Sequence, residues 1–168
     1  MTVVVHLAHA TAPPLSLRLA VALLAGFLAA LVMNAPMLAF AEGYAPAHVA
    51  ASVVWGTTPG ETGLGPAMLV HHTAGVLAGV LHLLLALGIE QLLPVSTRVA
   101  GLPLVPHLLA GGLVTLFLYG FFSWLVLPRF GAGVRDRAAT VTSRWAVSAL
   151  IFGWTLVAFV PTLAANLR

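Results

Sequence analysis

Four long apolar stretches, separated by short polar segments, dominate the pattern of hydrophobic and polar positions along the chain. They cover about residues 16–40, 66–93, 104–127 and 143–166. Each is long enough to cross about 30 Å of hydrocarbon, which takes about 20 residues of helix. The runs are continuous and lack the in-out alternation of membrane barrel strands. The sequence therefore predicts an all-α integral membrane protein with four transmembrane helices.

The connections between the stretches are short, which favours an up-down four-helix bundle in a single transmembrane domain over residues 1–168. The first and third stretches also share the sequence Leu-Leu-Ala-Gly, at residues 23–26 and 108–111. This repeat favours two tandem helical hairpins related by an axis along the membrane normal. A chance likeness between Leu-, Ala- and Gly-rich helices is the alternative.

A further apolar segment, residues 45–55, is too short to span a membrane and too apolar for a free loop. We expect a short interfacial or re-entrant helix there, between the first and second membrane helices, with Tyr44 and Trp55 at headgroup level. Residues 1–15 are expected to form an N-terminal arm, because the proline pair near the end of that segment favours extended backbone.

Local signals refine the ends of the first and third helices. The Ala-Phe-Ala triplet at residues 39–41 resembles a signal-peptidase site, but the apolar run before it exceeds the about 7–15 residues of a signal core. We therefore expect the first helix to be retained. Pro36 predicts a kink or an early end of regular helix, and Pro128 is expected to mark the end of the third helix.

The composition narrows the class of protein and its partners. Hydrophobic residues make up 61% of the chain and charged residues 7%. The basic residues are all arginine and form no run typical of a nucleic-acid footprint, so we expect no nucleic-acid partner. Cysteine is absent, which excludes disulfides and thiolate metal sites. The expected partners are the lipid bilayer and other membrane subunits or further copies of this chain, in a prokaryotic cell membrane.

Charge asymmetry favours one orientation. Arg18, Arg98 and Arg168 fall on one side of the predicted bundle, and the other arginines gather in residues 129–144. Because that group is clustered in one loop, the positive-inside rule favours a cytoplasmic location for the loop. Residues 41–65 would then lie on the cytoplasmic side as well.

Three histidines interrupt the second apolar stretch: His71, His72 and His82. At about 100° per residue, His71 and His82 lie within about 20° of each other, with Gly75 between them. An ionisable group that points into hydrocarbon is costly, so this face should contact other helices.

Glycines are expected to let these helices approach closely, at positions 75 and 79 of the second and 111 and 112 of the third. No Ser-His-acid arrangement, intramembrane acid pair or His-Glu-x-x-His motif is present, so enzymatic activity is the less favoured interpretation.

Because successive helices run in opposite directions, the end of the first helix, residues 41–65 and the start of the second helix meet at one membrane face. Polar and sulfur-bearing residues gather there. The candidate metal ligands there are Met33, Met37, His48, His71 and His72. Imidazole with thioether ligands suits copper. No spacing matches a compact metal motif, however, and the adjacent histidines point about 100° apart. We prefer a structural, hydrogen-bonding role for the histidines, with metal binding and proton handling as alternatives.

The candidate cofactor ligands are His72, His82 and His107. A haem between the second and third helices would need His82 and His107 at equal depth, whereas counting places them about 7–8 Å apart. The preferred interpretation of His82 is a neutral imidazole bonded to a Ser, a Thr or a backbone carbonyl of a neighbouring helix. Glu90 is expected to pair with His107 or with Arg98 at the membrane boundary.

Three segments carry a family resemblance: G-F-L-A-A-L-V-M-N-A-P-M (26–37), E-G-Y-A-P-A-H-V-A (42–50) and V-H-H-T-A-G-V-L-A-G-V-L-H (70–82). With them, residues 23–93 resemble small multi-helix membrane proteins of prokaryotes, halophilic archaea especially. That group has no established activity, so the resemblance implies a topology and no catalytic residues.

Three functions are consistent with these patterns. The first is a non-enzymatic membrane protein that serves as a subunit or assembly partner of a larger complex. The second is a histidine-based metal- or haem-binding protein in electron or proton transfer. The third is a small two-hairpin transporter, which predicts a polar cavity near His82 and Tyr119.

Overall fold

The computed structural model describes residues 12–94 and 97–167, so the expected N-terminal arm lies mostly outside the described residues. Within them, four helical spans are long and apolar enough to cross a membrane, which confirms the predicted all-α class. The spans are α1 (Leu15–Ala39), α3 (Leu64–Leu92), a composite span (Leu104–Phe130) and a last span (Arg135–Asn166) that contains α6 (Ala138–Asn166). The predicted boundaries of the first two helices agree within two residues, whereas the third span ends later and the last helix begins earlier than predicted.

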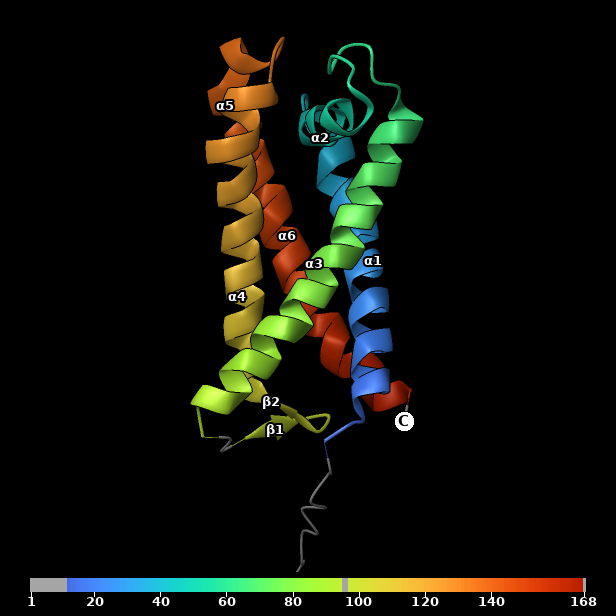
Figure 1. Cartoon of the computed structure of the whole chain (residues 1–168), viewed down its shortest axis with the longest axis vertical. Helices are drawn as coiled ribbons and strands as arrows, with labels where there is room; N and C mark the ends of the chain where they lie inside the picture. Colours follow the sequence, from blue (N-terminus) through green and yellow to red (C-terminus); the bar gives the residue numbers. More distant parts are fainter. Residues whose placement is uncertain (1–11, 95–96, 168) are drawn as a thin grey trace, which may run out of the picture.

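Successive membrane helices run in alternating directions around the bundle (Figure 1). Helix α1 packs against α3 and α6, and α4 (Leu104–Gly120) packs against the same two helices. In Figure 1, α1 and α4 stand nearly upright while α3 and α6 cross the bundle diagonally in opposite senses. The result is the expected up-down arrangement, with α1 and α4 held apart by the two crossing helices.

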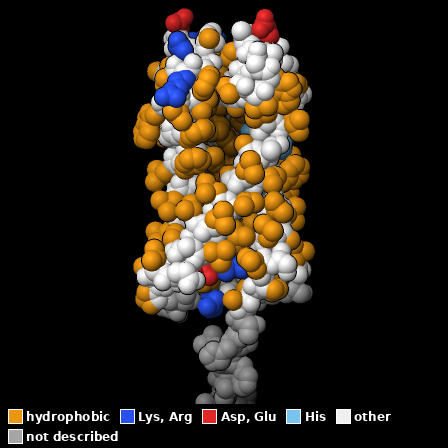
Figure 2. Space-filling view, in the orientation of Figure 1, with side chains coloured by type: hydrophobic (Ala, Val, Ile, Leu, Met, Phe, Trp, Pro, Cys, Tyr) orange, Lys and Arg blue, Asp and Glu red, His pale blue; other side chains and the backbone are white. Residues whose placement is uncertain are grey.

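The surface between the two ends of the bundle is apolar. Figure 2 shows hydrophobic side chains over the middle of the visible face and charged side chains toward its two ends. Large side chains such as Leu116, Leu77 and Trp154 are more than 60% exposed on the outside of the helices. Such a surface is expensive in water and is typical of helices that face lipid.

The third span continues past Pro128, so the predicted end of the helix there is wrong. After α4 comes a π-helical segment, η1 (Phe121–Val126), and then the short helix α5 (Leu127–Phe130). The N–H of Leu127 bonds to the carbonyl of Phe122, five residues back. This shift in register places Pro128 in the first turn of α5, where a missing N–H is tolerated.

Helix α2 (Ala45–Trp55) has the bounds that the sequence predicted. It lies at the same end of the molecule as α5 (Figure 1) and packs against α3, α5 and η1. One side of it is buried in protein, including Val49 and Ser52, while Trp55 is exposed. A location of Trp55 at headgroup level stays a prediction.

A small β-hairpin closes the other end of the bundle. Strand β1 (Arg98–Val99) pairs with β2 (Leu102–Pro103) through a two-residue turn whose φ angles are both positive, 46° and 68°. Such turns match the twist of a hairpin. The sequence predicted only a short connection here. Both residues of β2 are buried, so the hairpin acts as a cap over the helix ends.

Glycines allow the backbones of α1 and α3 to approach closely. A Cβ atom added to Gly79 would lie 3.0 Å from the Cα of Gly26, and one added to Gly75 would lie 3.0 Å from the Gly26 carbonyl. These contacts confirm the close approach predicted for Gly75 and Gly79. In α4, Gly111 faces Val157 of α6, but a Cβ on Gly112 would have nothing within 4 Å, so the packing role predicted for Gly112 is wrong.

Candidate functional site: a buried Arg-Glu-His-His cluster

The histidines of the membrane helices turn inward. His71, His82 and His107 are 8%, 2% and 3% exposed, respectively. The face of α3 that carries His71 and His82 therefore meets protein, as predicted from the cost of placing imidazoles in lipid. Each of these rings then needs a hydrogen-bond partner in the bundle.

His71 joins α3 to α1. Its Nε2 atom lies 3.1 Å from the carbonyl oxygen of Ala30. A carbonyl oxygen only accepts, so Nε2 carries the proton and donates. The neighbouring His72 donates from Nδ1 to the Met68 carbonyl at 2.8 Å, and its Nε2 accepts from the Asn34 amide at 3.3 Å. The two rings therefore serve different partners.

His82 joins α3 to α4. Its Nε2–H donates to the backbone carbonyl of His107 at 3.2 Å. Of the partners expected for His82, the structure thus selects a backbone carbonyl rather than a Ser or Thr hydroxyl. A carbonyl in a helix can accept this second bond because its oxygen has two lone pairs.

His107 in turn joins α4 to α6. Its Nε2–H donates to the carbonyl of Val157 at 2.9 Å. Four residues after Val157 stands Pro161, which lies inside α6 and has no N–H to offer. His107 therefore supplies a donor to a carbonyl that the helix itself leaves without one. Side chains re-satisfy backbone groups freed by proline in this way within membrane helices.

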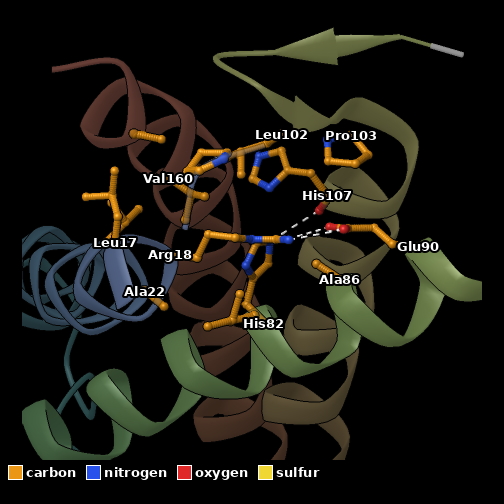
Figure 3. Close-up of a pocket in the computed structure, with 14 residues that line it drawn as sticks. Leu17, Arg18, Ala22, His82, Ala86, Glu90, Leu102, Pro103, His107 and Val160 are labelled. Carbon is orange, nitrogen blue, oxygen red and sulfur yellow. Dashed lines mark hydrogen bonds and ion pairs between the residues drawn. The ribbon is translucent and has the colours of Figure 1, made fainter. Parts of the chain in front are cut away.

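Arg18 and Glu90 form an ion pair beside these histidines. The Nη1 atom of Arg18 donates to Oε2 of Glu90 at 3.1 Å, and its Nη2 pairs with Oε1. The pairings predicted for Glu90, with His107 or Arg98, are therefore wrong; Arg98 donates to the Gly101 carbonyl instead. The reason is the reach of the long Arg18 side chain, which extends from the first turn of α1 across the bundle to Glu90 near the end of α3 (Figure 3).

These four residues form one polar group, here called the Arg18 cluster (Arg18, His82, Glu90 and His107). Figure 3 shows the Arg18 side chain reaching toward Glu90 with both imidazoles beside it. The two rings meet edge to face, with centroids 4.9 Å apart. A cavity of about 20 Å³ lies among them, with walls that are otherwise mostly apolar.

Sequence reasoning did not assign Arg18 to this site, although a signal was present. Arg18 stands one turn inside the first helix, and Glu90 stands near the end of the second. Antiparallel threading puts both at the same end of the bundle. An acid and a base at equal depth inside apolar helices would be expected to pair.

The opposite end gathers some of the predicted residues and separates others. The hydroxyl of Tyr44 donates to Asn34 at 3.4 Å, and Asn34 also contacts His72, as expected from the threading. His48 instead bonds through Nδ1 to the carbonyl of Thr62 at 2.9 Å. Met33 and Met37, the predicted thioether ligands, are buried in the apolar core.

An open hollow of about 480 Å³ lies beside this group, at the end of the bundle that carries α2. Tyr44, His48 and Arg137 are among its lining residues, and Arg137 is paired there with Glu42. Burial raises the pKa of the Tyr44 phenol, which keeps this side chain neutral and able to donate.

A local turn orders the loop before α3. The carboxylate of Glu61 accepts from the hydroxyl of Thr58 at 2.8 Å and from its backbone N–H at 3.1 Å. Both bonds favour the ionised form and lower the pKa of Glu61. Glu61 is thus held by its own loop, three residues from its partner Thr58.

Among the described residues, no three histidine or acidic side chains converge as a metal ion would require. The imidazoles of the predicted metal set (His48, His71 and His72) each bond to a different backbone carbonyl. The His82 and His107 rings contact each other, which leaves no room for a haem plane between them. Copper and haem binding stay predictions that this arrangement does not favour.

Comparison of the chain with protein-family models, with curated proteins and with solved structures gave no match in any of the three. The fold and the site alone therefore define the class of protein. Over the described residues it is an all-α fold with four helical spans apolar enough to cross a membrane, and the imidazoles of His71, His82 and His107 are buried between them.

Proposed function

We propose that this chain is a multi-pass protein of the cell membrane that carries out no chemistry of its own and acts as a subunit or assembly partner of a larger membrane complex. One observation carries the proposal. Each of the five histidines that the structure describes has a ring nitrogen bonded to a backbone carbonyl. The residue type best suited to chemistry in this chain is thus used for structure.

Three of these bonds each join a different pair of helices. His71 ties α3 to α1, His82 ties α3 to α4, and His107 ties α4 to α6. Hydrogen bonds between membrane helices average under about 1 kcal/mol each, which is enough to orient packing. This distribution supports a scaffold role, because each of the three bonds holds a different pair of helices together.

The surface available to a partner also supports assembly. The connections outside the four spans are short, and the spans themselves present large apolar side chains outward. A partner with a matching surface is another membrane protein or a second copy of this chain.

Native mass spectrometry of the tagged protein, released from its own membranes in lipid nanodiscs, tests the proposal. We expect a complex of fixed stoichiometry, containing either a second membrane polypeptide or a defined number of copies. The untagged strain carried through the same steps is the control for adventitious capture. A lone monomer in nanodiscs and in mild detergent would contradict the assembly role.

The geometry favours this role over transport and over cofactor binding. The cavity beside His82 measures about 20 Å³ and Tyr119 is not among its lining residues, whereas a transported solute larger than water needs more room. An absorption spectrum and metal analysis of the same preparation test the cofactor alternative. A stoichiometric metal or a haem band would overturn the proposal of a protein without chemistry.

A further inference from the structure

Two polar atoms of the Arg18 cluster are buried without a partner. They are Nε of Arg18 and Nδ1 of His107, and neither has a hydrogen bond to any described residue. The Arg18 side chain is 9% exposed and His107 is 3% exposed. A buried polar atom without a hydrogen bond is costly, so this pair requires an explanation.

The chemistry of the two atoms is complementary. The Nε of arginine always carries a hydrogen and can only donate. In a neutral imidazole one nitrogen donates and the other accepts, and Nε2 of His107 already donates to Val157. Nδ1 of His107 is therefore an acceptor. A bridging ligand must accept from Arg18 and donate to His107, which water can do and a simple anion such as chloride cannot.

The cavity that both residues line is large enough for such a ligand. Arg18 and His107 both line the cavity of about 20 Å³ in Figure 3. One enclosed water needs roughly 10–15 Å³ of this kind of space and two to four polar partners. Most of the wall is apolar, from residues such as Val21, Ala86 and Val160, so a water held here is directed to the few polar atoms.

We infer that this cavity is a binding site for one ordered water molecule, which accepts a hydrogen bond from Arg18 Nε and donates one to His107 Nδ1. The water joins the Arg18–Glu90 ion pair to the His107–Val157 bond. A single hydrogen-bonded group then extends over α1, α3, α4 and α6 at the hairpin end of the bundle. The site goes beyond the proposed assembly role and does not depend on it.

A structure of the full chain in lipid nanodiscs, at a resolution that shows ordered water, tests the inference directly. We expect a peak within about 2.7–3.2 Å of both Arg18 Nε and His107 Nδ1. The inference is overturned by the lack of such a peak, by a protein atom in that position, or by a direct N–H···N bond between the two side chains.

A thermal-unfolding cycle tests the same link in solution. Arg18→Lys keeps a charge for Glu90 but removes the Nε donor, and His107→Gln keeps an amide donor but removes the ring acceptor. Because each change alone removes one of the two atoms that the water joins, the Tm loss of the double variant should be smaller than the sum of the losses of the two single variants.

His71→Gln is the matched control, because His71 is also buried and also donates from Nε2 to a backbone carbonyl. Its Tm loss should add to that of Arg18→Lys. Additive losses for Arg18 and His107 would count against the water bridge. Should a variant fail to fold, the density in the unmodified protein still decides.

Discussion

A proline in α6 explains why a histidine sits in α4. Pro161 cannot donate to the carbonyl of Val157, and the Nε2–H of His107 fills that place from the neighbouring helix. His48 bonds to the carbonyl of Thr62, which also stands four residues before a proline, Pro66. Thr62 lies in the loop before α3, whereas the carbonyl of Val157 lies within a membrane span, where no solvent can satisfy it and a donor from the protein is needed.

The link between His107 and Pro161 predicts a dependence between the two positions. His107→Leu should lower the free energy of unfolding by about 1–3 kcal/mol, since it leaves the Val157 carbonyl buried and unpaired. In a Pro161→Ala background the same change should cost less, because residue 161 then offers its own N–H. Chemical or thermal unfolding in nanodiscs measures both losses.

His71→Leu serves as the control for that cycle. Its carbonyl partner, Ala30, is followed four residues later by Asn34, which has an N–H. The cost of His71→Leu should therefore be the same with and without Pro161. Equal costs of His107→Leu in both backgrounds would show that the proline does not explain this bond.

At the level of helices, the contact of α1 with α3 depends on glycine where two backbones cross. A Cβ at Gly79 would lie 3.0 Å from the Cα of Gly26, and the neighbour there is backbone that cannot rotate away. Gly88 lies on the same helix, but a Cβ there would meet nothing within 4 Å. The two positions therefore separate a packing effect from helix propensity.

Gly79→Ala should destabilise the protein by about 1–3 kcal/mol, because the added methyl forces the helices apart. Gly88→Ala, the matched control, should be neutral or stabilising by up to about 1 kcal/mol, since the added methyl meets nothing within 4 Å and alanine has the higher helix propensity. Thermal unfolding compares the two variants. If both substitutions were tolerated equally, the backbones of α1 and α3 would have room for a methyl group at Gly79, and the close contact would be contradicted.

Local patterns predicted some helix ends and missed others. Residues 45–55 match α2, because a short apolar run bounded by turns leaves few alternatives. The end of the third span was wrong because the π-helical segment η1 absorbs Pro128. A neighbour distant in sequence packs against that segment: the ring of Trp145 in α6 lies 5.2 Å, centroid to centroid, from the ring of Phe122.

For the whole molecule, the distribution of arginine predicts its orientation. The end that carries α2 and the loop before α6 holds most of the arginines, and the hairpin end carries Arg18 and Arg98. By the positive-inside rule we expect the α2 end to face the cytoplasm.

Single cysteines can report this orientation, because the chain has none of its own. Ala132 and Val99 are exposed at opposite ends. In intact cells, a membrane-impermeant maleimide should label Val99→Cys and should label Ala132→Cys only after permeabilisation. The reverse pattern would place α2 on the outer side and contradict the assignment.

The sequence by itself determined the class of protein, the number of long helices and the inward direction of the histidines. All three follow from the free-energy cost of leaving polar groups in hydrocarbon. This cost applies to each segment whichever helices it packs against. The tertiary structure alone decided the partners: Glu90 with Arg18, His82 with the carbonyl of His107, and His107 with Val157. Pairing depends on how α3 and α6 cross the bundle, and crossing angles arise from packing between helices rather than from any pattern within one.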